Sequence, residues 1–251
     1  MKKYFFSRTL GVVLLCLAAG ILFSNSLSAN SSWKHTKKEV YSYMDDLSRN
    51  PDTPAYCSLH YRVRKLYFSM EPHGSNPVVF LGDSMTDEGD WKKLFPDVNL
   101  VNRGIGGDTT LGVLNRIDQV LALAPSKIFL MIGTNDLCYK RSVADTLKNY
   151  DQILNILHKN LPQTKIYVES VLPFNDQIFP SRYLRTNENI EELNRGIKKL
   201  AEKYEYPYLD LVPFFMDENG RLPENYTVDG LHLNENGYTI WKSRIKNFVK
   251  E

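Results

Sequence analysis

A serine, an aspartate and a histidine in this sequence have the types and contexts that nucleophilic catalysis requires. Ser84 follows a short apolar run and lies in the turn Gly82-Asp83-Ser84-Met85-Thr86. A serine hydroxyl becomes an effective nucleophile only when a nearby base takes its proton. His232 is the candidate base, and Asp229 can orient the imidazole ring and favour its charged form. Together these residues predict an esterase with a serine nucleophile.

Each of the three residues also has a simpler interpretation. Ser84 can be a helix N-cap, a common role for serine after a strand. Asp229 and His232 can form a turn that caps the last helix, or they can ligate a metal, since carboxylate and imidazole are both ligands. The other histidines fall on expected helices or in a linker: His35, His60, His73 and His158. None is a second metal ligand at the usual spacing, so we expect neither a metal nor a cofactor.

Ester hydrolysis also requires hydrogen-bond donors for the negative charge that develops on the carbonyl oxygen. Gly107 lies in a glycine-rich turn that can expose a backbone N–H, and Asn135 can offer a side-chain amide. The backbone N–H of Ser84 is a third donor. Loss of one such donor typically lowers the rate by about 10²–10³-fold. Taken alone, Gly107 suits a phosphate-binding turn and Asn135 an ordinary turn residue, so only the combination is specific.

The combination resembles the SGNH (GDSL) hydrolase family over residues 78–251. The matching blocks are Gly82-Asp83-Ser84, Gly107, Gly133-x-Asn135-Asp136 and Asp229-x-x-His232, in that order. The resemblance implies that Ser84 is the nucleophile and that Asp229 and His232 complete the catalytic triad. It also implies that Ser84, Gly107 and Asn135 form the oxyanion hole.

The stretch Asn102–Thr110 narrows the resemblance to two groups of that family. It looks like the catalytic subunits of platelet-activating-factor acetylhydrolase and like bacterial carbohydrate O-acetylesterases. The implied fold is a flavodoxin-like three-layer α/β/α sandwich. One departure is Met85, where the family usually has leucine, and this is a mild, volume-conserving change. The sequence has no Gly-x-Ser-x-Gly elbow, which argues against the α/β-hydrolase fold.

Short apolar runs alternate with longer amphipathic stretches from residue 78 onward, which independently predicts a five-stranded parallel α/β sheet. The expected strands are Val78–Leu81, Val98–Val101, Ile128–Ile132, Ile166–Val168 and Tyr208–Leu211. The expected helices are 109–122, 142–160, 187–204 and 235–249. Ligands bind at the carboxyl ends of such strands, and polar and glycine residues follow the first three strands there. The loop 172–180, rich in aromatic and amide groups, is expected to border the pocket.

The first 29 residues have the three-part layout of a secretory signal peptide. Three basic residues precede an apolar run over 10–23, and small polar residues then lead to Ala29. The run is shorter than the roughly 20 residues that a membrane-spanning helix needs, so we expect cleavage and export. An uncleaved membrane anchor and a lipoprotein at Cys16 are the alternatives. Residues 30–74 are expected to form a helical extension, and 75–251 the hydrolase domain.

Charge and cysteine content limit the possible partners. The chain has 31 basic and 29 acidic residues, and residues 1–29 hold three of the basic ones and none of the acidic ones. The mature chain is therefore near −1, which argues against nucleic acid as a partner. Cys57 and Cys138 can form a disulfide in an exported protein, or they can be two buried free thiols.

Export and the acetylesterase-like stretch favour a carbohydrate O-acetylesterase acting on a glycan or a sialic acid. A lysophospholipase or acyl thioesterase is the alternative within the same chemistry. A non-catalytic glycan-binding relative is the alternative from another class. Asp83 and Asp136 are expected to accept backbone N–H bonds. Arg103 can contact a substrate or form a surface ion pair, and we do not count it among the catalytic residues.

Overall fold

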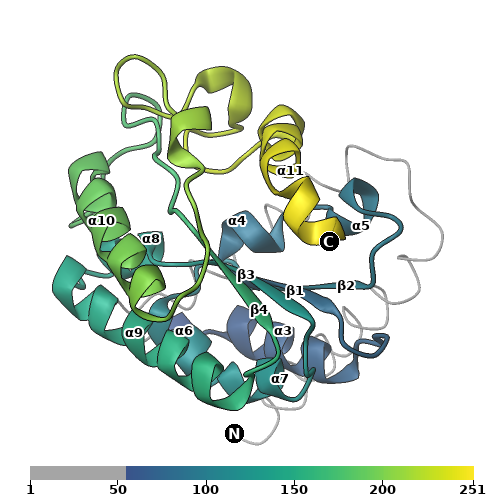
Figure 1. The fold of residues 1–251 in the computed structure, drawn as a ribbon. Helices are drawn as coiled ribbons and strands as arrows, with labels where there is room; N and C mark the ends of the chain where they lie inside the picture. Colours follow the sequence, from purple (N-terminus) through teal and green to yellow (C-terminus); the bar gives the residue numbers. More distant parts are fainter. Residues whose placement is uncertain (1–54) are drawn as a thin grey trace, which may run out of the picture. The chain divides into compact units, whose positions relative to one another are not determined.

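The described strands form a parallel sheet in the order β2-β1-β3-β4-β5 (Figure 1). The computed structural model describes residues 55–251, which all belong to one compact unit. The strands are β1 Val78–Gly82, β2 Leu100–Gly104, β3 Lys127–Met131, β4 Lys165–Glu169 and β5 Tyr208–Leu209. The order reverses between β1 and β3, as in flavodoxin-like sheets. The expected α/β sandwich with a five-stranded parallel sheet is therefore confirmed.

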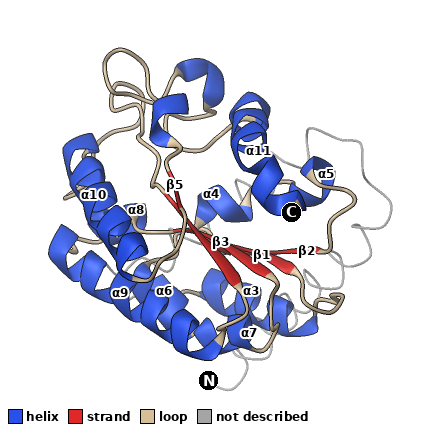
Figure 2. Cartoon of the chain, in the orientation of Figure 1, coloured by secondary structure: helices blue, strands red, loops and turns tan. Residues whose placement is uncertain are grey.

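Different helices cover the two faces of the sheet, because successive strand residues point to opposite sides. Figure 2 shows helices on both sides of the sheet. Val79 and Leu81 of β1 join a cluster of mostly aliphatic side chains, whereas Phe80 joins a second cluster rich in aromatic rings. The first cluster is completed by α6 Thr110–Asn115, α7 Ile117–Leu121, α9 Val143–Asn160 and α10 Asn187–Lys203. The second is completed by α5 Trp91–Leu94 and α11 Glu235–Lys250.

Short polar side chains fix where the long helices begin. The hydroxyl of Ser142 accepts a hydrogen bond from Asp145 N at 3.0 Å, which caps α9. Thr186 caps α10, and Asn234 caps α11. Each cap satisfies a backbone N–H that has no partner inside its helix. These three helices accordingly lie within a residue of the ranges expected from the sequence.

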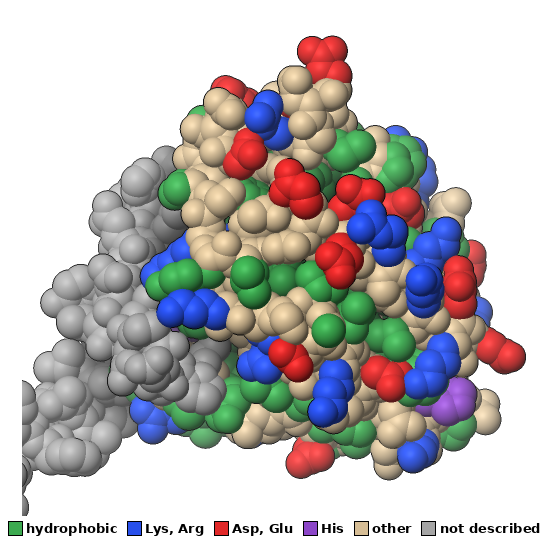
Figure 3. All heavy atoms as spheres, turned by 90° about the vertical axis from the view of Figure 1, so that its left-hand side faces the viewer, with side chains coloured by type: hydrophobic (Ala, Val, Ile, Leu, Met, Phe, Trp, Pro, Cys, Tyr) green, Lys and Arg blue, Asp and Glu red, His purple; other side chains and the backbone are tan. Residues whose placement is uncertain are grey.

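The outer surface of α9 and α10 is polar and of mixed charge. Figure 3 shows lysine and arginine side chains interspersed with acidic ones over this side of the molecule. The ion pair between Lys203 and Asp151, with Nζ and Oδ1 2.7 Å apart, links the two helices. Within the described residues, no helix is both long enough and apolar enough to span a bilayer.

The structure shifts some of the expected bounds: β5 ends at Leu209, two residues early, and the largest differences are in β2 and in the helix expected over 109–122. Strand β2 begins two residues later than expected and runs on through Asn102, Arg103 and Gly104. The Arg103 guanidinium is buried and pairs with Glu71, so the expected surface ion pair is wrong. The single helix expected over 109–122 is two helices, α6 and α7, which meet at Arg116.

The described part of the N-terminal extension contains a 3₁₀ turn, Ala55–Cys57, and helix α3, Leu59–Met70. Tyr61 and Phe68 of α3 are buried with Ile105 in a small third hydrophobic cluster. The signal peptide expected over 1–29 and the first helical stretch of the extension lie outside the described residues.

Cys57 of the N-terminal extension and Cys138 of the main domain are both free thiols. The alternative of a disulfide between them is therefore wrong. Cys57 is exposed, which also corrects the expectation that both thiols are buried. Cys138 is partly buried, at the end of helix α8, Thr134–Cys138.

Candidate active site

Ser84 is the first residue of helix α4, Ser84–Asp87, and one residue, Asp83, separates it from the end of β1 at Gly82. The N-cap of this helix is Asp83, whose Oδ1 accepts a hydrogen bond from Met85 N at 3.0 Å. The capping role that was the simpler interpretation of Ser84 therefore belongs to its neighbour. The Ser84 hydroxyl is left to hydrogen-bond another side chain.

That side chain is His232, whose Nε2 lies 3.1 Å from Ser84 Oγ. On the other side of the ring, Nδ1 lies 2.8 Å from Asp229 Oδ2. These distances are within the 2.6–3.2 Å range expected for a nucleophile, its base and the group that orients the base. The structure thus brings together three residues that are 148 and 3 positions apart in the sequence.

Asp229 is held by its own loop. Its Oδ1 accepts backbone hydrogen bonds from Leu231 at 3.0 Å and from His232 at 2.8 Å. Burial raises the pKa of Asp229, but the hydrogen bond to the His232 ring, the charge of that ring and the two backbone N–H groups outweigh it. The net effect holds the pKa of Asp229 well below its usual range. Asp229 is therefore ionised when the imidazole ring of His232 carries a positive charge.

Gly107 and Asn135, two of the three expected oxyanion donors, follow β2 and β3 at the same edge of the sheet. Gly107 has a φ of +76°, and a side chain at this position would meet open space. Within the described chain, its N–H donates to no protein acceptor. Asn135 is buried on α8, and its Nδ2 donates one hydrogen bond to the Asp108 carbonyl at 3.0 Å. One amide hydrogen orients this side chain, and the other is available for a ligand.

Asp136 and Asp83 have the structural roles expected of them. Asp136 is fully buried and accepts hydrogen bonds from Thr110 N at 2.9 Å and Thr110 Oγ1 at 2.5 Å. Burial raises the pKa of Asp136 to about 6 and that of Asp83 to about 7. Asp136 fixes α6 against α8, which carries Asn135. Asp83 fixes the start of α4, which carries Ser84.

A buried ion pair, which sequence analysis did not predict, lies under the site. Asp108 Oδ2 lies 2.9 Å from both Nε and Nη2 of Arg116, and both side chains are buried. Nη2 of Arg116 also donates to the Gly82 carbonyl at 3.1 Å. The arginine thus ties the segment 104–109, which carries the expected donor Gly107 and is called the oxyanion loop below, to the end of β1. This pairing explains why the helix expected over 109–122 breaks where it does.

The loop 172–180 lies against the Asp229–His232 loop, as expected from the sequence. Asn175 N donates to the Gly230 carbonyl at 2.7 Å. Gly230 has a φ of +94°, and a Cβ there would lie 2.6 Å from Ile178 and 2.9 Å from Phe179. The ring of Phe179 stands edge-on to that of His232, with centroids 6.5 Å apart. Only glycine fits this close approach, which sets the position of the base.

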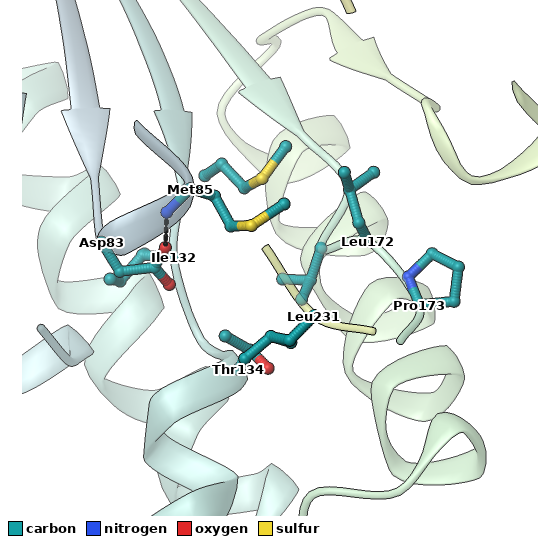
Figure 4. A pocket seen from close by; sticks show the side chains of 9 residues that line it. Asp83, Met85, Ile132, Thr134, Leu172, Pro173 and Leu231 are labelled. Atoms are coloured by element: carbon teal, nitrogen blue, oxygen red, sulfur yellow. Dashed lines mark hydrogen bonds between the residues drawn. The ribbon is translucent and has the colours of Figure 1, made fainter. Parts of the chain in front are cut away.

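A cavity of about 10 Å³ lies beside the site (Figure 4). Four of its lining residues are direct sequence neighbours of candidate catalytic residues: Asp83 and Met85 of Ser84, Thr134 of Asn135 and Leu231 of His232. Its other lining side chains are Met131, Ile132, Val171, Leu172 and Pro173. The cavity is mostly apolar, but the buried Thr134 hydroxyl has no hydrogen-bond partner in the described structure.

No cluster of three or more His, Cys, Asp or Glu side chains suited to a metal ion occurs in residues 55–251. The groups assembled here are instead a hydroxyl, an imidazole, a carboxylate and amide donors. This set can carry out acyl transfer through a serine nucleophile.

Comparisons with known proteins agree with this chemistry. The model of the GDSL-like Lipase/Acylhydrolase family matches residues 80–240. Platelet-activating factor acetylhydrolase IB subunit alpha1 from Rattus norvegicus is 30% identical over 190 residues, which are 73% of this chain and 78% of that protein. A GDSL-like lipase from Bacteroides thetaiotaomicron has a TM-score of 0.64 at 26% identity, covering 74% of this chain and 97% of that chain.

An acetyl xylan esterase has the same fold, with a TM-score of 0.59 at 22% identity over 68% of this chain and 98% of that chain. The family match spans every block of the site, from the Ser84 turn to His232. The chain therefore belongs to the GDSL-like lipase/acylhydrolase family and is a hydrolase of ester bonds.

Proposed function

We propose that this hydrolase is a serine esterase that removes short acyl groups, with a carbohydrate O-acetyl ester as its substrate. The observation that carries the mechanism is the 3.1 Å contact between His232 Nε2 and Ser84 Oγ. His232 takes the proton of Ser84 as the hydroxyl attacks the ester carbonyl. Asp229 holds the ring and stabilises its charged form.

The oxyanion of the tetrahedral intermediate lies against the N–H groups of Ser84 and Gly107 and the amide of Asn135. His232 then protonates the leaving alcohol. A water molecule repeats the sequence on the acyl-enzyme, and the acid is released. The three donors stabilise charge that exists only in the transition states and intermediates, which is where binding accelerates a reaction.

The size of the cavity supports a short acyl group. The cavity has a volume of about 10 Å³, and the residues that surround it adjoin the nucleophile, the amide donor and the base. We propose that the acyl group enters this cavity, whose volume leaves little room beyond a methyl group. Two of the similar proteins also act on acetyl groups according to their names, an acetylhydrolase and an acetyl xylan esterase.

One observation favours a lipid-like ester as a second candidate. Ile178 and Val228, on the two loops beside His232, expose 48% and 56% of their surfaces. Apolar side chains at the rim of a site suit a long acyl chain or a lysophospholipid. We nevertheless favour acetate, because the rim can contact the alcohol part of the substrate whereas the cavity limits the acyl part. Export through the N-terminal segment would bring the enzyme to glycans outside the cytoplasm.

The test measures acyl-chain preference on p-nitrophenyl esters and acetate release from acetylated polysaccharides, acetylated sialic acids and lysophospholipids. We expect the highest kcat/KM on acetate, and acetate release from at least one carbohydrate. Rates that rise toward long chains would instead support a lipase. Labelling of Ser84 by a fluorophosphonate excludes a non-catalytic glycan-binding protein, whereas wild-type turnover by Ser84→Ala would refute the mechanism.

A further inference from the structure

We propose that Arg64 of helix α3 is a positioning residue for the oxyanion hole, acting through Asp87 on the loop that carries Gly107. This inference rests on the proposed function, because it assigns Gly107 as an oxyanion donor. It gives the described part of the N-terminal extension a role in the reaction.

Arg64 and Asp87 together hold the oxyanion loop at two points. Nη2 of Arg64 donates to the Gly104 carbonyl at 3.1 Å and lies 2.6 Å from Asp87 Oδ1. The other carboxylate oxygen, Asp87 Oδ2, accepts the backbone N–H of Gly106 at 3.1 Å. Both oxygens of Asp87 are thus used, one by the arginine and one by the loop.

Asp87 also connects this loop to the nucleophile. It is the last residue of the four-residue helix α4, and Ser84 is the first. A shift of Asp87 would therefore change the distance between the hydroxyl of Ser84 and the donor of Gly107. Misplacement of reacting groups by about 1 Å can lower a rate by about 10²-fold.

The loop needs such support because two consecutive glycines, Gly106 and Gly107, have more conformational freedom than any other pair. The hydrogen bond from Gly106 N to Asp87 is the last fixed point before Gly107, whose own N–H donates to no acceptor in the described chain. If that bond is lost, only the turn bond from Asp108 N to the Ile105 carbonyl, at 3.0 Å, still constrains the direction of the Gly107 N–H.

The arginine is itself held in place from α3. The side chains of Arg64 and Asp87 are 17% and 13% exposed, so their attraction is only partly screened by water. The guanidinium carbon of Arg64 lies 4.8 Å from the centroid of the Phe68 ring, one helical turn along. His60, on the preceding turn, places Nε2 3.8 Å from Asp87 Oδ2. Two successive turns of α3 thus face the Asp87 carboxylate, and the next turn packs against the arginine.

The neighbouring residue Lys65 supplies a matched control. Its Nζ donates to the Asn115 carbonyl at 3.0 Å, so it ties α3 to α6 and not to the oxyanion loop. The experiment compares Arg64→Gln, Arg64→Lys and Lys65→Gln in the full chain. It measures kcat and KM on p-nitrophenyl acetate, the melting temperature, and the fraction of active sites titrated by a fluorophosphonate.

We expect Arg64→Gln to lower kcat per titrated site by about 10–100-fold with little change in KM, by analogy with the loss of one oxyanion donor. Arg64→Lys keeps a cation beside Asp87 but lacks the planar fork, so we expect a loss of about 3–10-fold. Lys65→Gln should stay within about twofold of wild type. Inhibition by an alkylboronic acid, which forms a tetrahedral anion on the serine, should weaken in Arg64→Gln in proportion to kcat/KM.

Wild-type kcat per titrated site in both Arg64 variants would overturn the positioning role, as would equal losses in Lys65→Gln. If Arg64→Gln does not fold, the test uses Arg64→Lys alone. Wild-type kcat per titrated site in Arg64→Lys, or an equal loss in Lys65→Gln, would then overturn the positioning role. Ser84→Ala is measured in parallel. Turnover by that variant would refute the esterase mechanism itself, whereas an inactive Ser84→Ala with unaffected Arg64 variants would refute only the present inference.

Discussion

Asp83 caps the helix that begins at Ser84, and this division of work leaves the serine hydroxyl available to the base. Asp83 Oδ1 accepts the Met85 N–H at 3.0 Å, while Ser84 Oγ lies 3.1 Å from His232 Nε2. Adjacent residues thus have different partners: Asp83 caps the helix, and the Ser84 hydroxyl remains free to hydrogen-bond the His232 ring.

The first prediction separates the cap from its charge. Asp83→Asn keeps an oxygen for Met85 N, so we expect it to fold and to retain most of the activity. Asp83→Ala removes the cap, which typically costs about 1 kcal/mol, and frees the Ser84 hydroxyl to turn toward the exposed N–H. We expect a lower melting temperature and a loss in kcat of about tenfold or more. Equal activity of the two variants would contradict the capping role.

The second prediction concerns the group that orients the base. Asp229→Asn preserves the shape of the loop but can no longer stabilise the charged ring, and it favours the wrong tautomer of His232. We expect kcat to fall by about 10³–10⁴-fold while KM changes little. Initial-rate kinetics with p-nitrophenyl acetate measure kcat and KM directly, and circular dichroism serves as the control for folding.

The same experiment extends to the whole triad. Ser84→Ala, His232→Ala and the double variant should have similar residual rates, because groups that act as a unit lose their effect together. Losses that multiply in the double variant would show that Ser84 and His232 act independently, contrary to the 3.1 Å contact.

The third prediction uses two glycines with nearly the same backbone. Gly107 and Gly220 have φ of +76° and +77°, and a Cβ at either position would meet no atom within 4 Å. Alanine should therefore impose a similar strain, about 1–2 kcal/mol, at both. We expect both variants to lose similar stability in urea unfolding, but only Gly107→Ala to lose activity, by about 10²-fold or more. Equal activities would remove Gly107 from the oxyanion hole.

Sequence periodicity was sufficient to predict the sheet and the long helices. Strands buried on both faces, such as β1 and β3, are continuous apolar runs, and α9, α10 and α11 carry their own caps. These signals are local, so they can be seen without the tertiary structure. The blocks at Ser84, Gly107 and Asn135 could also be predicted, because each follows a strand that the pattern places, whereas the Asp229–His232 block is identified by its residue types and spacing.

What could not be predicted depends on contacts between distant segments. Strand β2 extends through Arg103 because Glu71, the residue after α3, pairs with that buried guanidinium. Helix α6 ends where Arg116 turns inward to Asp108. Burial of a charge is acceptable only with its partner in place, and neither partner can be identified from the local sequence. The Arg64–Asp87 pair could not be predicted from the sequence for the same reason.

The fourth prediction tests the acyl cavity. Met131 lines the cavity, whereas its neighbour Leu130 points to the opposite face of the same strand. Alanine at either position should cost about 2–5 kcal/mol, so both variants are assayed below their melting transitions. We expect Met131→Ala to raise the ratio of butyrate to acetate hydrolysis by about tenfold, and Leu130→Ala to leave the ratio unchanged. An unchanged ratio in Met131→Ala would mean that another surface limits the acyl group.

The fifth prediction concerns stability against pH. Glu169 is buried at the end of β4, where its Oε1 accepts the indole N–H of Trp241 at 2.7 Å. Burial, only partly offset by that hydrogen bond, raises the pKa of Glu169 from 4.5 to about 8. Between these values the folded protein keeps a proton that the unfolded chain has released.

Stability must therefore fall as pH rises through this window and level off above it. The raised pKa of Asp83 contributes in the same direction, up to about pH 7. Glu169→Gln keeps an acceptor for Trp241 without the titration, so its melting temperature should fall less than that of wild type between pH 5 and pH 9. Glu192→Gln, at an exposed position on α10, should follow the wild-type curve. A Glu169→Gln curve parallel to that of wild type would mean that this carboxyl group is ionised in the folded protein throughout the range.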